Sequence, residues 1–205
     1  ETKSRSEWLQ SWRRFRANRA AVVSLVFVVL ICLMALLAPW VAPHNPNHSF
    51  PGMRGGAPTW EHPMGFDHIG RDLLSRVIFG ARVALLVGIV ATAISVVLGV
   101  LVGAIAGYFG GWVDTVLSRI VDTLMAFPLL VLLIVLSAVL GPSLTTTIVV
   151  IGGTTWARFA RVVRADVMSL QHADFVTAAR ASGVRDLRII LRHVLPNVMG
   201  PVIVL

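Results

Sequence analysis

Long uncharged stretches alternate with short polar segments along the chain. The first stretch, 20–41, is rich in Val, Leu and Ile, and as a helix rising 1.5 Å per residue it would cross a hydrocarbon core of roughly 30 Å. A second runs over 83–113, and the pair Gly110-Gly111 predicts that its helix ends near Gly107. The pattern is that of membrane-spanning helices.

A third uncharged stretch, 123–157, is too long for one span, and Gly141-Pro142 divides it into two. Four complete spans are therefore predicted, with a fifth beginning near Val198. The sequence stops at Leu205, which lies 13 residues beyond Arg192, the last charged residue, and 13 residues are too few to cross a bilayer. We therefore expect that the chain is truncated by at least one span.

The first apolar stretch could also be read as a cleaved signal peptide. It is longer than the roughly 7–15 residues of a signal core, and Ala38-Pro39-Trp40 is a poor cleavage site. A transmembrane helix at 20–42 is therefore the favoured interpretation. It leaves a basic cytoplasmic segment at 1–19, an external loop at 43–82 and a helical core at 83–205.

Composition agrees with a membrane protein and excludes a nucleic-acid binder. Of the 205 residues, 56% are hydrophobic and 14% charged, against about 25% charged in soluble domains. The basic residues behind the net charge of +8 do not form one continuous stripe, because they lie on both sides of the apolar spans. Six precede the first span and seven arginines lie within 158–192, and by the positive-inside rule both clusters predict a cytoplasmic side. Arginines at 54, 71, 76 and 82 in the predicted external loop disagree with this orientation.

The segment 174–197 reads as two short helices. Asp174 is predicted to cap the first, Gly183 to end it in a left-handed turn, and Asp186 to cap the second, which Pro196 closes. In the second helix, apolar residues recur at helical spacing on a face opposite to arginines, which favours a helix lying on the inner membrane surface. These apolar residues are Leu187, Ile190, Leu191 and Val194.

The spacing of Ala178-Ala179, Gly183 and Leu195-Pro196 resembles the EAA loop of ATP-binding-cassette (ABC) importer permeases. Similarity to the C subunits of dipeptide and oligopeptide permeases extends over nearly the whole chain. It includes 62–82, 107–114, 119–122 and Phe127-Pro128. Thr177 stands where the motif has Glu, and His193 where it has Ile.

The resemblance implies an all-α, polytopic permease of the type I importer fold, with about six transmembrane helices when complete. It implies peptide import across the bacterial inner membrane, with a second homologous permease, two ATPase subunits and an external binding protein as partners. The loop at about 166–197 would dock on the ATPase. Its coupling residues would be Asp174, Phe175, Thr177, Ala178, Ala179, Arg180, Gly183, Leu195 and Pro196.

The chain has no catalytic residues in this interpretation and no cofactor of its own. Its only lysine is Lys3, so it cannot supply the lysine of a phosphate-binding loop. ATP and Mg²⁺ would be bound by the partner ATPase subunits.

Other functions stay open at this point. A nickel or glutathione permease would share the same machinery. An ion-driven secondary transporter would ordinarily show buried acidic residues or unwound helices at the midplane, and none is evident in the four spans. A receptor or scaffold would leave the EAA spacing unexplained.

Several smaller features have two interpretations. A row of small residues, Ser95, Gly99, Gly103 and Gly107, favours helix packing over a permeation path. Phe127-Pro128 is expected to bend the third span. Asp114 and Asp122 are interpreted as interfacial residues that set topology, with gating as the alternative. Histidines at 44, 48, 62 and 68 are taken as solvated loop residues, with a metal such as nickel as the alternative.

Overall fold

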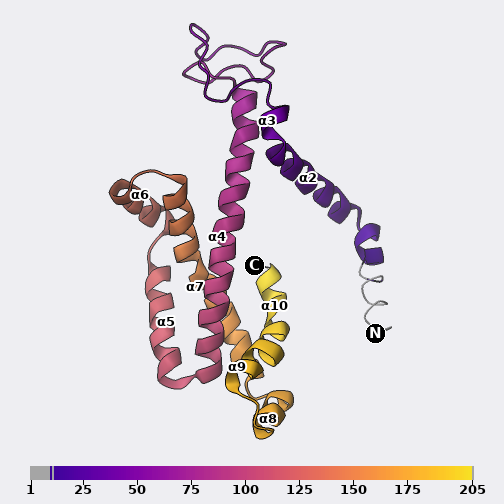
Figure 1. Cartoon of the computed structure of the whole chain (residues 1–205), viewed down its shortest axis with the longest axis vertical. Coiled ribbons are helices and arrows are strands. Elements are labelled where there is room, and N and C mark those ends of the chain that lie inside the picture. The colour runs from indigo at the N-terminus through magenta and orange to yellow at the C-terminus, as the bar shows by residue number, and fades with distance from the viewer. Residues whose placement is uncertain (1–9, 11, 205) are drawn as a thin grey trace. The chain divides into compact units, whose positions relative to one another are not determined.

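The computed structural model describes residue 10 and residues 12–204, and most of these residues lie in helices (Figure 1). Within this part of the chain there is no β-strand, only isolated bridges between Ser49 and Arg71 and between Phe66 and Asp72. The all-α prediction is therefore confirmed. Residues 1–9 and 11 of the predicted basic segment, which include Lys3 and Arg5, lie outside the described residues.

The chain forms two compact units, Glu1–Leu86 and Val87–Leu205. The first unit contains helices α2 (Arg19–Leu36) and α3 (Ala38–Val41), a loop, and the beginning of α4. Asn18 caps α2 by accepting a hydrogen bond from the Ala21 amide at 3.3 Å. Leu37 separates α2 from α3, so the first predicted span is one long helix followed by a single turn.

Helix α4 extends over Leu73–Phe109, so it begins ten residues before the predicted start at Val83. Asp72 precedes its first residue and accepts a hydrogen bond from the Ser75 amide at 2.8 Å, which satisfies one free amide of the first turn. Arg76, on the exposed side of this turn, pairs with Asp67. Of the four arginines in the predicted external loop, Arg76 and Arg82 therefore belong to α4, whereas the other two precede it.

We call the segment 42–72 the histidine loop. Asp67 organises its last part, because Asp67 Oδ1 accepts hydrogen bonds from the amides of Ile69 and Arg71, both at 2.9 Å. Partial desolvation raises the pKa of Asp67, but these bonds and Arg76 outweigh it and lower the pKa from 3.8 to about 2. The loop is thus held by an ionised carboxylate.

The lowered pKa of Asp67 predicts a pH dependence. A carboxyl group whose pKa falls on folding contributes stability that is fully present above its unfolded pKa, here 3.8, and is lost as pH falls toward 2. We expect hydrogen-exchange protection of the Ile69 and Arg71 amides, corrected for intrinsic rates, to be constant from about pH 7 to 5 and to decline below about pH 4. In Asp67→Ala, protection should be low throughout; full protection in this variant would contradict the assignment.

The second unit contains the rest of α4 and seven further helical elements. These are α5 (Gly111–Ala126), α6 (Leu129–Leu140), α7 (Leu144–Leu170), α8 (Asp174–Ala181), α9 (Asp186–Ile189), the π-helix η1 (Ile190–Val194) and α10 (Leu195–Val204). Helix α5 returns along the lower part of α4 in Figure 1, and α7 packs against α5, α6 and α10. The core is formed by α4, α7 and the segments after α7, with Val163, Val167, Val176, Ile189 and Val194 fully buried.

Three of the predicted glycine and proline positions end helices. Helix α4 ends at Phe109, before Gly110 at φ 62°. Helices α5 and α6 meet at an angle of 83° across Phe127-Pro128, so the expected bend is a complete break. Gly141-Pro142 separates α6 from α7, whose N-cap Ser143 accepts a hydrogen bond from the Thr146 amide at 3.0 Å.

The small-residue row of α4 packs against α7, which confirms the packing interpretation. Ser95 Oγ contacts the Gly152 carbonyl at 3.1 Å and Thr155 Oγ1 at 2.5 Å. A Cβ added to Gly103 would lie 2.5 Å from the Ala160 carbonyl oxygen, and one added to Gly107 would lie 2.7 Å from that of Arg164. The two helix backbones approach so closely that only glycine fits.

Among the described residues, three helical segments are long and apolar enough to cross a membrane, or four if the α5–α6 pair counts as one broken span. The three are α2, α4 and the run Asp186–Val204. Helix α7 is not among them, so the fourth predicted span, over 142–157, is not recovered. The reason is that the uncharged part of α7, 144–157, is too short for a span, and the helix continues through Arg158, Arg161 and Arg164.

Candidate functional site: the α8–α9 segment

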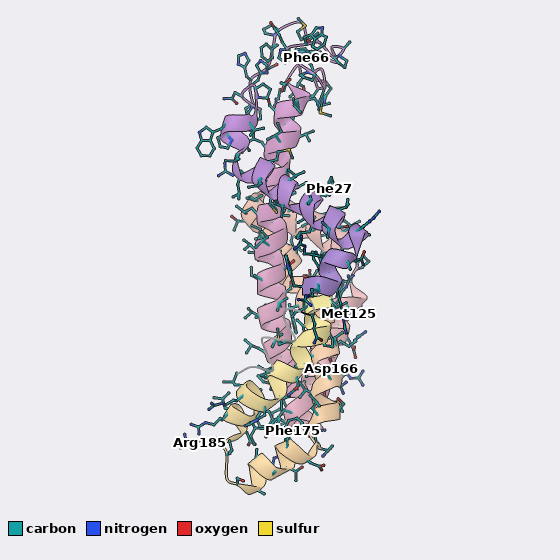
Figure 2. The ribbon with its side chains drawn as sticks, turned by 90° about the vertical axis from the view of Figure 1, so that its right-hand side faces the viewer. Phe27, Phe66, Met125, Asp166, Phe175 and Arg185 are labelled. Atoms are coloured by element: carbon teal, nitrogen blue, oxygen red, sulfur yellow. The ribbon has the colours of Figure 1, made fainter. Side chains whose placement is uncertain are left out.

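The predicted coupling residues lie in and after α8, which leaves the end of α7 through a short turn. Val176 is fully buried and anchors α8 to the core, where Ala179 also packs. The opposite face is exposed, and Phe175 retains 42% of its surface. Both Phe175 and Arg185 lie at the lower end of the view in Figure 2. Five of the predicted coupling residues share the exposed part of α8: Asp174, Phe175, Thr177, Ala178 and Arg180.

Gly183 ends α8 with a left-handed turn, as predicted. Its φ is +77°, and its amide donates to the Arg180 carbonyl at 3.0 Å. The next amide, of Val184, donates to the Ala179 carbonyl at 3.2 Å. These bonds close the helix end and direct the chain back toward the core. A Cβ at position 183 would meet no atom within 4 Å, so the backbone angle alone makes this position suited to glycine.

The predicted caps are wrong by one residue. Ala173 and Arg185 occupy the N-cap positions, while Asp174 and Asp186 lie in the first turns of α8 and α9, and neither cap forms a side-chain hydrogen bond. Acidic residues in a first turn also interact favourably with the helix dipole. An acidic residue in the first turn therefore gives nearly the same sequence pattern as one at the N-cap. This places the Asp186 carboxylate on the side of α9 that faces α4.

Asp186 there contacts Tyr108, a residue that sequence reasoning missed. The Tyr108 hydroxyl donates to Asp186 Oδ1 at 2.5 Å, and the Arg180 guanidinium lies 5.3 Å from the centre of the Tyr108 ring. Tyr108 is 5% exposed and lies in the last turn of α4. Tyr108 therefore connects the end of α4 to both α8 and α9, the helices before and after Gly183. The available signal was that this is the only tyrosine in the chain.

Tyr108→Phe should weaken this junction. The variant loses one hydrogen bond to a partly exposed carboxylate, which is worth about 1 kcal/mol, but keeps the ring under Arg180. We expect faster amide exchange at Ile189, in α9, with little change in the α4–α7 contact. Phe109→Leu, at an exposed neighbouring position, is the matched control. Equal protection of Ile189 in wild type and Tyr108→Phe would show that the contact contributes nothing.

The second predicted helix differs from expectation. Ile189, Ile190 and Val194 form its buried face, whereas Leu187 and Leu191 are 67% and 54% exposed. The face is rotated because Ile190–Val194 is a π-helix, in which the Leu195 amide bonds to the Ile190 carbonyl five residues earlier.

Pro196 does not end the helix, because it lies in the first turn of α10, where a missing amide hydrogen is tolerated. Leu195 is partly buried and packs on the core, while Pro196 is exposed. The run Asp186–Val204 meets the length and apolarity of a span, which differs from the predicted surface helix with a span beginning near Val198.

Two ion pairs connect α5 to α7 near this segment. Arg164 forms a two-pronged pair with Asp114, with Arg164 Nη2 2.7 Å from Asp114 Oδ2, and Arg161 Nη2 lies 2.7 Å from Asp122 Oδ1. The first pair is partly buried and the second is more than half exposed, so the second contributes less than about 1 kcal/mol. Asp114 and Asp122 therefore each connect α5 to α7 through an ion pair.

The family model described as "Binding-protein-dependent transport system inner membrane component" matches residues 99–205, which include the whole α8–α9 segment. The chain belongs to this family. A second model, for the N-terminal TM domain of oligopeptide transport permease C, matches residues 6–58. Membership confirms the predicted resemblance and, together with the apolar helices, a multi-pass inner-membrane permease.

Relatives of this permease family cover the chain almost completely. It is 43% identical to the oligopeptide transport system permease protein OppC of Escherichia coli over 206 residues, covering all of this chain and 68% of that protein. It is 40% identical to the glutathione transport system permease protein GsiD of Shigella flexneri over 202 residues, or 98% and 66% of the two chains. A permease protein of Brucella abortus is 42% identical over 192 residues, 94% of this chain, and the chain spans 64% of that relative's length.

Proposed function

We propose that the chain is a non-catalytic permease subunit of an ATP-driven importer of short peptides. The observation that carries the proposal is the exposed face of α8, anchored by Val176 and ended by the left-handed Gly183, in the region that the family model matches. The names of the E. coli and other relatives support peptides as cargo.

The proposed partners follow from the same surface. Phe175, Thr177 and Ala178 present an apolar and small-residue patch that a cytoplasmic ATPase subunit could cover without leaving a buried charge unpaired. The Thr177 hydroxyl donates a hydrogen bond to the Ala173 carbonyl at 3.2 Å. Thr177, which stands where the motif has Glu, is therefore hydrogen-bonded to its own backbone and carries no charge that needs a basic partner. A second permease and a substrate-binding protein complete the proposed complex, and ATP and Mg²⁺ are bound by the ATPase subunits.

The proposed mechanism is mechanical. Closure of two ATPase subunits displaces α8, and the core contact of Val176 and the Tyr108–Asp186 bond carry the displacement to α4. In this proposal the N-terminus and α8 face the cytoplasm, where the ATPase subunits lie, and the histidine loop faces outward. No residue of the chain is assigned a role in ATP chemistry.

The test is reconstitution of the full-length protein with its genomic neighbours in proteoliposomes. Expected results are co-purification of a second permease and ATPase subunits, and ATP-dependent uptake of labelled di- to pentapeptides in the presence of the binding protein. Competition by unlabelled glutathione and by Ni²⁺ distinguishes the cargo alternatives. Uptake driven by an ion gradient, without ATP or partners, would overturn the proposal.

A further inference from the structure

We propose that the histidine loop holds a divalent transition-metal ion between His44, His62 and Asp72. This inference is independent of the proposed cargo, and the cluster lies entirely within the first compact unit. One potential ligand atom from each of the three side chains lies within 4.8 Å of the other two. The sequence-based expectation of solvated histidines is wrong for His62, which is 7% exposed, whereas His48 and His68 are exposed.

The two imidazole rings face the same carboxylate. They are stacked with their centres 4.3 Å apart and their planes inclined by 25°. His62 Nδ1 lies 2.8 Å from Asp72 Oδ1, and His44 Nδ1 lies 3.9 Å from Asp72 Oδ2. Metal–ligand bonds of about 2.0–2.2 Å separate neighbouring ligand atoms by about 3–4 Å, so small rotations of the rings would bring all three groups onto one ion.

An unsatisfied nitrogen points to a ligand. His44 Nδ1 is buried and, among the described residues, has no hydrogen-bond partner, because 3.9 Å to Asp72 is too long. Leaving a buried polar atom unpaired costs about 1–3 kcal/mol. A metal ion bonded to this nitrogen would remove the cost and neutralise part of the charge of Asp72, which is completely buried.

The scaffold holds the three groups in place. The backbone amide of His44 donates to Ser75 Oγ at 3.0 Å, and that of His62 donates to Thr59 Oγ1 at 3.1 Å. Asp72 also accepts the Ser75 amide at 2.8 Å, which fixes its second oxygen. Phe66, labelled in Figure 2, packs against His62 with ring centres 4.3 Å apart. Such backbone and aromatic support reduces the entropy lost when an ion binds.

The donor set selects the class of ion. Two imidazole nitrogens and one carboxylate suit Zn²⁺, Ni²⁺ or Co²⁺, whereas Mg²⁺ and Ca²⁺ prefer oxygen ligands only. His44 is 29% exposed and borders a cavity of about 510 Å³ lined also by Pro43, Asn45 and Phe79. The cavity gives an ion a path of entry and leaves room for water as a further ligand.

The experiment is isothermal titration of the full-length protein in detergent after treatment with EDTA. We expect one Zn²⁺ per chain with a Kd in the micromolar range or tighter, and no saturable heat with Mg²⁺. His44→Ala should weaken Zn²⁺ binding at least tenfold, whereas His68→Ala, an exposed histidine of the same loop, should leave it unchanged. Circular dichroism and the melting temperature of each variant show that the fold is retained.

A spectroscopic measurement keeps the proposal testable if His44→Ala is unstable. Co²⁺ bound to wild-type protein should give visible absorption bands of a four-coordinate nitrogen and oxygen site, which Zn²⁺ then abolishes. Absence of stoichiometric Zn²⁺ binding by wild-type protein would overturn the proposal and leave His44, His62 and Asp72 as a metal-free support for the start of α4. Equal binding by wild type and a folded His44→Ala would also overturn it.

Discussion

Gly183→Val is expected to reduce ATP-driven uptake about tenfold or more while the protein still inserts and folds. Position 183 has φ +77°, where a β-branched residue costs about 1–3 kcal/mol. Relief of that strain would open the turn and shift α8, on which the proposed ATPase contact depends. Because no atom lies within 4 Å of the added Cβ, the core itself should be undisturbed.

The measurement compares uptake and ATP hydrolysis in proteoliposomes that contain the complete complex. Gly183→Asn is the matched control, because Asn tolerates left-handed backbone angles better than other residues with a side chain. It should retain most of the uptake. Equal uptake by wild type and Gly183→Val would show that the shape of this turn is unimportant for coupling.

Gly103→Leu is expected to have the largest effect on folding. Its Cβ would lie 2.5 Å from the Ala160 carbonyl oxygen and 2.9 Å from Val163 Cβ, so α4 and α7 would have to separate. Overpacking of this kind costs about 3 kcal/mol, which should lower the melting temperature in detergent by roughly 6–12 °C.

Gly88→Leu provides the control for this substitution. Gly88 lies on the same helix, but an added Cβ there meets no atom within 4 Å. Its melting temperature should stay within about 2 °C of wild type, since surface changes are usually worth less than about 0.5 kcal/mol. Similar destabilisation by both substitutions would mean that a larger side chain destabilises α4 at either position, and that the α4–α7 contact does not govern the result.

Features fixed by a few neighbouring residues could be predicted from the sequence. The breaks at Gly110-Gly111, Phe127-Pro128 and Gly141-Pro142 depend on local backbone chemistry, and all three occur. The row of small residues in α4 also predicted packing, because its spacing of four places these residues on one face of the helix. The left-handed turn at Gly183 belongs to the same class.

Features that depend on distant residues could not be predicted. The early start of α4 depends on Asp67 pairing with Arg76 and on Asp72 capping the helix, and both residues read as part of a polar loop. The rotated face of η1 follows from one extra residue per turn, which hydrophobic spacing cannot reveal. The contact of Tyr108 with Asp186 joins residues 78 positions apart, and the cluster of His44, His62 and Asp72 also forms only when distant parts of the loop meet.

The break between α5 and α6 would let a small rotation at Phe127-Pro128 move α6 as one rigid segment. Its twelve residues span about 18 Å, so a rotation of 10° at Phe127-Pro128 would displace the far end by about 3 Å. Because Pro128 has no amide hydrogen, such a rotation breaks fewer helical hydrogen bonds than bending a continuous helix. A small angular change at one dipeptide is thereby converted into a displacement as large as the diameter of a water molecule.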